Sequence, residues 1–333
     1  MKTKIFPVLV VSMMTLFACE NKNLTPIQEE KESVTFEVAL SMPKTRTETL
    51  SDEETVHTYQ VFVYSLDSEL LETYAKVSGT ETSVKLDCRV GRKEIVVLAN
   101  APDLASLTSL SMMKQARSRL EHNDVGSLVM EGSTEVELTS SMTSAVEVKL
   151  KRIVAKVRLT GIKVNFESSA YDETQFELLC AYMINVPADK KYLSTMEANA
   201  DNGPTSWYNQ LYYISDSKYD SLLHSDINVS GVTDYETEHI FYCYPNPYTA
   251  DDYSSEGWTE RPTRLIVKAQ YEGKFYYYPI SIPDLKQNTV YDVSLVITRP
   301  GTTDWNDDMK KYEDLFTISV LDWETGDTVE EIL

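Results

Sequence analysis

The sequence predicts an all-β, mainly antiparallel protein with two tandem β-sandwich domains, the first of which carries one packed helix. Tyrosine, valine, isoleucine and threonine fill its apolar segments, with 21 tyrosines against only 11 glycines, which is typical of strands. Short runs that alternate apolar and polar residues recur along the chain. Its 333 residues, 42% of them hydrophobic, suffice for two domains that each bury a core.

The first residues predict export as a lipoprotein. Lys2 and Lys4 give a positive start, and the apolar run that follows ends at Phe17 and is too short to span a bilayer as a helix. Cys19 then completes the motif Leu-Phe-Ala-Cys, which resembles a lipobox. We therefore expect residues 1–18 to be a signal peptide and Cys19 to become the acylated N-terminus. The alternative is an ordinary secretory signal with an incidental cysteine.

Residues 19–46 predict a tether followed by a strand. The polar stretch 20–33 has no period and is expected to be extended. The next seven residues alternate strictly, which predicts a half-buried strand. Its inward side chains are Val34, Phe36, Val38 and Leu40. The polar stretch from residue 41 to residue 54 contains Arg46 and is expected to be an exposed loop.

The first domain is expected to span residues 47–163. Its strands are predicted at residues 57–65, 70–77, 83–88, 93–99, 134–138, 145–150 and 153–159. One helix is expected to begin near Asp103, which follows Pro102 and is a good N-cap residue. Apolar residues that follow at helical spacing are Leu104, Leu107, Leu110 and Met113.

The second domain is expected to span residues 164–333. Its strands are predicted at residues 176–186, 239–244, 264–271, 274–280, 290–298 and 315–323. Glu272 and Gly273, between two alternating runs, predict a tight hairpin turn. Residues 187–238 show no clear period. Because so long a loop is unusual in a compact domain, we expect short helices or an elaborated surface there.

No residue pattern points to catalysis, a metal or a cofactor. The four histidines lie far apart and share no ligand spacing with cysteine or acidic residues. A net charge of −21 argues against nucleic acid and anionic lipid as partners. Cys88, Cys180 and Cys243 lie in apolar contexts and are expected to be free thiols, with a disulfide between the last two as the open alternative.

Several segments together resemble the fimbrillins, the type V pilin subunits of Bacteroides-like bacteria. They are the lipobox at Cys19, the strand 34–40 with its following Lys-Thr-Arg, Val-Val-Leu-Ala-Asn-Ala-Pro at residues 96–102, Leu-Lys-Arg-Ile-Val-Ala-Lys-Val at residues 150–157, and the C-terminal run from residue 290. Their order covers essentially the whole chain, which makes the combination more specific than any single segment. Residues 187–238 match no segment of the family that we can name.

The resemblance implies assembly by donor-strand exchange. The lipoprotein precursor would reach the outer membrane, where a trypsin-like protease cuts after Arg46 and leaves Thr47 as the new N-terminus. The first strand then leaves, and a neighbouring subunit supplies its replacement. The donor would be the C-terminal segment, through Phe316, Ile318, Val320 and Trp323. The alternation shifts at Leu321, as at a bulge. It is poor beyond residue 328, so this tail is either a kinked donor or a cap on its own domain.

The sequence thus predicts a non-enzymatic stalk or tip subunit of a fimbrium, serving adhesion. Its expected partners are other fimbrial subunits, the outer membrane through the lipid on Cys19, and a ligand on a host or bacterial surface. One alternative is a subunit that keeps its lipid and anchors the fibre. Another is a surface lipoprotein that binds glycan or peptide through aromatic residues, although the tyrosines at 276–278 also suit an ordinary sandwich strand.

Overall fold

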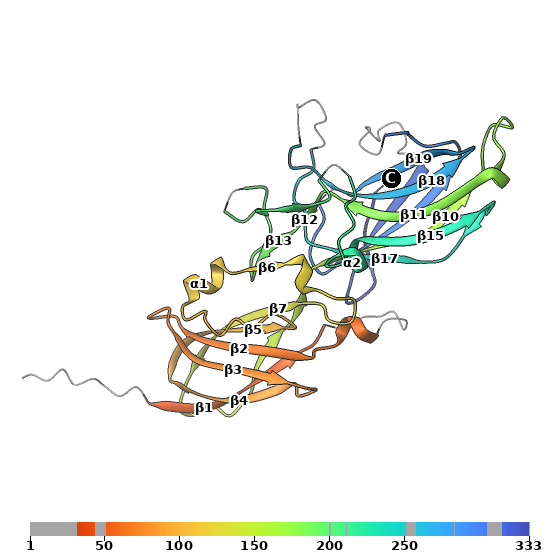
Figure 1. Ribbon diagram of the computed structural model, residues 1–333. Helices are drawn as coiled ribbons and strands as arrows, with labels where there is room; N and C mark the ends of the chain where they lie inside the picture. Colours follow the sequence, from red (N-terminus) through yellow and green to blue (C-terminus); the bar gives the residue numbers. More distant parts are fainter. Residues whose placement is uncertain are drawn as a thin grey trace, which may run out of the picture.

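The computed structural model describes residues 32–43, 51–199, 201–210, 212–250, 258–282, 284–304 and 315–332. These residues form two lobes, each made of facing β-sheets (Figure 1). The expected all-β, mainly antiparallel fold is confirmed, and the expected strands form with boundaries shifted by a few residues. Within the described residues, no helix has the length and apolar character needed to cross a membrane.

Two sheets of the first lobe enclose a separate core. The five-stranded sheet has the order β3-β2-β5-β7-β9, formed by Leu71–Ser78, Thr58–Ser65, Gly91–Ala99, Met130–Leu138 and Lys151–Arg152. The three-stranded sheet has the order β4-β1-β8, formed by Ser83–Arg89, Ser33–Ser41 and Val146–Lys149. Alternate side chains of both sheets meet in this core, among them Val61, Ile95 and Val148. In β1 the buried face is the one that its alternation predicted, whereas β2 is buried on both faces.

The second lobe is a larger sandwich. Its six-stranded sheet has the order β16-β10-β20-β21-β22, with β17 also paired to β10; the strands are Asp234–Tyr235, Ala155–Val164, Thr289–Ile297, Phe316–Asp322, Thr328–Ile332 and His239–Cys243. The four-stranded sheet has the order β15-β11-β18-β19, formed by His224–Ser230, Phe176–Ile184, Thr263–Tyr271 and Lys274–Ile282. Glu272 and Gly273 have φ values of 48° and 76° and form the predicted hairpin turn between β18 and β19.

The helix expected at Asp103 begins later than predicted. Helix α1 spans Leu110–Gln115, and Ser109 caps it by accepting a hydrogen bond from the backbone N–H of Met112. Asp103 instead lies in a turn, where its carboxylate accepts from the N–H of Ala105 and pairs with Lys76 at 3.0 Å. The periodicity was correct for Leu110 and Met113, both of which are buried. The cap was assigned wrongly because an aspartate also stabilises an Asx turn.

Asn100, in the Asn-Ala-Pro segment after β5, has a structural role. Asn100 has a φ of 54°, in the left-handed region that asparagine tolerates better than most residues. Its amide nitrogen donates to the carbonyl oxygens of Thr55 and Leu128, and its side-chain oxygen accepts from the N–H of His57. One side chain thus joins its own turn to the connection at residues 55–57 and to the segment at Leu128.

Residues 187–238 form the elaborated surface that was expected. They hold short strands β12 to β14, helix α2 and β15: Val186–Pro187, Asp189–Lys191, Trp207–Tyr208, Asp220–Leu223 and His224–Ser230. Part of this segment also joins the two lobes. Strand β13 pairs with β6, Arg117–Arg119, and Lys190 forms a buried ion pair of 2.8 Å with Glu131 on β7. Arg117 pairs with Asp189 at 2.7 Å beside it.

The hydrogen bonds of β10 bear on where the lobes divide. β10 pairs with β17 and β20 of the second lobe, although it precedes the boundary that we expected at residue 163. We now propose that the division lies just before β10.

Cys88, Cys180 and Cys243 are free thiols. Among the described residues, no group of three histidine, cysteine or acidic side chains is arranged to hold a metal ion.

A buried histidine predicts how stability depends on pH. Both ring nitrogens of His239 are engaged, one 2.7 Å from the hydroxyl of Ser225 and the other 2.9 Å from the hydroxyl of Tyr235. Burial lowers the pKa of His239 from its usual 6.5. Below pH 6.5 the imidazole therefore binds a proton more readily in the unfolded chain than in the folded protein. The free energy of unfolding is therefore expected to fall as the pH drops below about 6.5. Urea unfolding should show a smaller fall in His239→Gln, whereas His57→Gln, at an exposed site, should behave like the parent.

Candidate assembly site

Strand β1 occupies the centre of the three-stranded sheet. It pairs antiparallel with β4 from Ser33 to Ala39 and parallel with β8 from Val38 to Ser41. Within the described sheet, β4 and β8 are held together only through β1. Removing β1 would therefore expose the backbone of two strands at once, and unpaired strand edges readily accept another strand.

The inward face of β1 completes the core of the first lobe. Its four predicted side chains, Val34, Phe36, Val38 and Leu40, are all buried and pack against residues of the opposite sheet. The outward face is polar, and Thr35 donates a hydrogen bond of 2.5 Å to Asp87 on β4. The predicted strand thus forms with the predicted faces. A replacement strand would need apolar side chains at four alternate positions.

The sequence that follows β1 contains predicted processing sites. Cys19, Arg46 and Thr47, predicted as the lipidation and cleavage sites, lie outside the described residues. The described chain resumes at Ser51–Glu54, a short 3-10 helix. Glu53 in this turn is 0% exposed, although it belongs to a stretch that the sequence predicted to be an exposed loop. That expectation was wrong at this residue.

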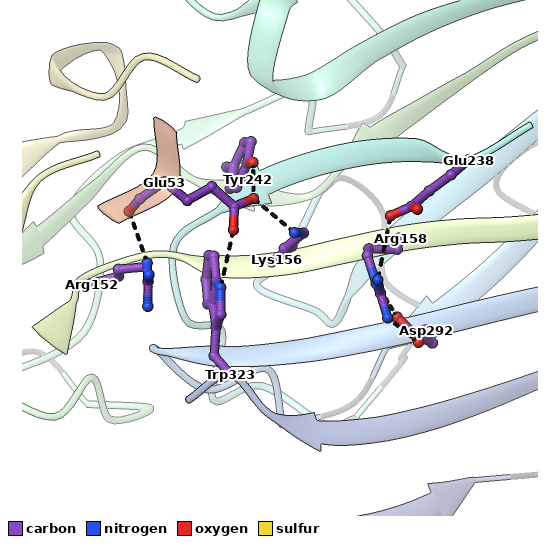
Figure 2. A network of polar contacts seen from close by, with 8 residues as sticks. All are labelled: Glu53, Arg152, Lys156, Arg158, Glu238, Tyr242, Asp292 and Trp323. Atoms are coloured by element: carbon purple, nitrogen blue, oxygen red, sulfur yellow. Dashed lines mark hydrogen bonds and ion pairs between the residues drawn. The ribbon is translucent and has the colours of Figure 1, made fainter. Parts of the chain in front are cut away.

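Glu53 is buried because the second lobe supplies partners for both carboxylate oxygens (Figure 2). One oxygen is 2.7 Å from the ammonium of Lys156 on β10 and also accepts a hydrogen bond from the hydroxyl of Tyr242 on β17. The other accepts from the indole N–H of Trp323 at 3.2 Å. The Glu53 carbonyl accepts from the guanidinium of Arg152 at 3.1 Å. We call Glu53, Arg152, Lys156, Tyr242 and Trp323 the Glu53 cluster.

The Glu53 cluster holds a buried carboxylate with a partner at each of its two oxygens. Burial, reinforced by the Glu53 carboxylate, raises the pKa of Tyr242 well above its usual range, so its hydroxyl keeps the proton that it donates. The guanidinium of Arg152 lies over the Trp323 ring, 4.6 Å from its centroid, a favourable cation–π geometry. The cluster therefore joins the turn before β2 to the end of β21 without exposing charge to water.

The predicted donor residues lie in a strand that the chain uses itself. β21 pairs along seven residues with β20, and Ile318 and Trp323 are 0% and 2% exposed. Val320 is also buried, whereas Phe316 is half-buried. The bulge expected at Leu321 does not lie in β21 itself, whose register with β20 runs unbroken through Leu321. The irregularity lies in the pairing with β22, where Val329 is the extra residue between Thr328 and Glu330. The tail at residues 328–332 forms β22, which pairs only with β21 at the sheet edge.

Sequence reasoning missed the Glu53 cluster. A signal was present in Lys156, a lysine within the apolar run of β10, since a lysine is rarely buried unless it is paired. Its partner could not be identified from sequence, because Glu53 is one of three consecutive acidic residues and 103 positions distant from Lys156 (156 − 53).

The fold and this site define a class of protein: tandem β-sandwiches whose N-terminal strand completes a sheet of the first lobe and whose C-terminal strand lies at an edge of the second. Comparison with known proteins gives a family match over part of the chain. Residues 33–160 match the family model for the major fimbrial subunit protein (FimA), which confirms the resemblance to the fimbrillins. None of the curated proteins matches the sequence.

Solved structures share the fold over most of the chain. A protein from Bacteroides eggerthii with a cell-adhesion assignment gives a TM-score of 0.66 at 18% identity, covering 87% of this chain and 95% of its own. The fimbrilin FimA from Porphyromonas gingivalis gives 0.64 at 16% identity, with coverages of 88% and 98%. The C-terminally truncated tip fimbrial protein Mfa3 from the same species gives 0.55 at 14% identity, with coverages of 88% and 100%.

The family match over residues 33–160 and the fold shared with these structures relate the chain to fimbrial subunits.

Proposed function

We propose that this protein is a stalk or tip subunit of a type V fimbria that polymerises by donor-strand exchange and serves adhesion. In this proposal it is exported as a precursor with lipid on Cys19, reaches the outer membrane, and is activated by a cut after Arg46. The observation that carries the proposal is the position of β1, inserted between β4 and β8 and buried on one face.

The loss of β1 would create a strong demand for a replacement strand. At about 1.5–3 kcal/mol for each buried apolar side chain, its four inward residues contribute roughly 6–12 kcal/mol of burial. Two rows of backbone hydrogen-bonding groups would be exposed as well. A free groove of this kind is much less favourable than one filled by a neighbour, so exchange would drive polymerisation.

The pairing of the two C-terminal strands supports a choice of which part of the C-terminus is released. β21 is paired on both sides and ends in the buried Trp323, whereas β22 is an edge strand. Val329 on β22 is 70% exposed. An apolar side chain gains no burial energy at such a position in a monomer, but it would gain it if the strand were inserted into a neighbouring subunit. We therefore propose β22 as the part that is released first, with Phe316, Ile318, Val320 and Trp323 following only if β21 is also donated.

Mapping the N-terminus tests the processing steps. Protein from the cell surface is expected to begin at Thr47, and its precursor at an acylated Cys19. Several acyl chains would hold the precursor firmly to a bilayer, since each buried CH₂ contributes about 0.8 kcal/mol. Mass spectrometry and N-terminal sequencing distinguish the two forms. A surface form that keeps the lipidated Cys19 would instead support the anchoring alternative, and an unmodified Cys19 in the precursor would refute lipidation.

A further inference from the structure

The outer face of the four-stranded sheet carries an aromatic hollow. The strand register places Cys180, Lys268 and Tyr277 in one row across β11, β18 and β19, and Tyr182 beside His224 in the next row. These side chains point away from the large core, because Tyr182 belongs to a separate small cluster with Ile184 and Ile266.

The hollow is large enough for a small ligand. Its volume is about 470 Å³, and its walls are mainly Tyr182, Tyr212, Tyr213, Tyr277, His224 and Lys268. Sites for small molecules commonly range from about 300 to 1,000 Å³ and combine aromatic walls with a few polar groups. The loop residue Tyr212 forms an open rim and is 55% exposed.

The aromatic wall is fixed before any ligand arrives. The ring of Tyr213 lies 4.9 Å from that of His224 and 5.1 Å from that of Tyr182, measured between centroids. Its hydroxyl donates a hydrogen bond to Asp220, which also accepts from the hydroxyl of Ser215 at 2.6 Å. Rings held in this way lose little conformational entropy on binding.

The charge of the hollow is opposite to that of the chain. Lys268 is its one permanently charged lining residue, in a protein of net charge −21. The Lys268 ammonium lies 4.3 Å from the centroid of the Phe275 ring, and it forms no ion pair with any residue in the described ranges. The nearest acidic neighbour in the row, Asp226, is 76% exposed beside His224 and is not part of the lining.

We propose that this hollow binds a sugar ring that carries an acid group, a carboxylate or a sulfate. Tyrosine ring faces pack against the C–H face of a pyranose, while tyrosine hydroxyls and the His224 imidazole suit its hydroxyl groups. The Lys268 ammonium pairs with the acid group. This binding does not require assembly, because the uncut monomer already contains the hollow. Its failure and the failure of donor-strand exchange are therefore distinguishable.

Saturation-transfer NMR and calorimetry on the purified full chain test the proposal. The probes are a disaccharide containing glucuronic acid and the matched disaccharide containing glucose, with a sulfated analogue as the second acid. The acidic probes are expected to bind at least about tenfold more tightly than the neutral one, since hydrogen bonds to charged groups are stronger by about 1–2 kcal/mol. Binding should weaken as salt is raised.

Two lysine variants locate the site. Lys268→Met should weaken acidic binding at least about tenfold and leave the neutral probe unchanged. Lys274→Met removes the same charge from the exposed start of β19, outside the lining, and should leave both affinities unchanged. Tyr213→Ala should weaken both probes, with unfolding measured alongside. Equal binding of acidic and neutral probes, no binding of any probe, or equal effects of the two lysine variants would overturn the proposal.

Discussion

Replacing Glu53 by alanine is expected to lower the free energy of unfolding by about 3–5 kcal/mol, because Lys156 would be left as a buried charge without its carboxylate. Tyr242 and Trp323 would lose their shared acceptor as well. Denaturant unfolding measures the loss. Hydrogen exchange should also show faster opening at the end of β21, since Trp323 is no longer held.

A second pair in the same chain gives the control for Glu53. Lys149 and Glu324 are 2.8 Å apart, but the Lys149 side chain is 56% exposed. Glu324→Ala should therefore change stability by no more than about 1 kcal/mol. Replacing Glu53 and Lys156 together by leucine and methionine should restore part of the loss, because no unpaired charge remains. If Glu53→Ala costs no more than Glu324→Ala, the Glu53 cluster does not hold the lobes together.

Removal of residues 1–46 is expected to convert a stable monomer into chains that resist SDS at moderate temperature. The freed groove lacks roughly 6–12 kcal/mol of apolar burial, and a donated strand can leave only if all its backbone hydrogen bonds open together. Limited trypsin treatment of the precursor, followed by gel filtration and electron microscopy, measures this. Deleting residues 328–333 should abolish growth while leaving Trp323 in the Glu53 cluster.

Two aspartate substitutions separate donation from folding. Ile318 is 0% exposed and paired within its own sheet, so Ile318→Asp should destabilise the monomer by several kcal/mol. Val329 is 70% exposed, so Val329→Asp should leave monomer stability nearly unchanged and still weaken assembly. If the variant that lacks residues 328–333 polymerises at the parent rate, β22 is not the donor. If trypsin cuts other lysine or arginine sites earlier than the bond after Arg46, the proposed processing site is wrong.

Local pattern alone was sufficient for most of the long strands. In β1, burial follows the period of two, because alternation of side chains between two faces is a property of the extended backbone. In β2 both faces are buried, one in each core. The hairpin turn at Glu272 and Gly273 was equally local, since its φ values depend on those two residues. The start of α1 could not be predicted from local sequence in this way. Asp103 can cap a helix or stabilise a turn, and the surrounding structure determines which of the two it does.

What the sequence by itself determined was most of the long strands, the buried face of β1 and the resemblance to the fimbrillins. Only the tertiary structure decided that Glu53 is buried and that Lys190 joins the two lobes through its ion pair with Glu131. It also decided that β21 is internal to its sheet while β22 lies at the edge. The physical reason is the range of the interactions. Alternation is written into neighbouring residues, whereas a buried charge depends on a partner brought from a distant strand, and neither residue type reveals that partner in advance.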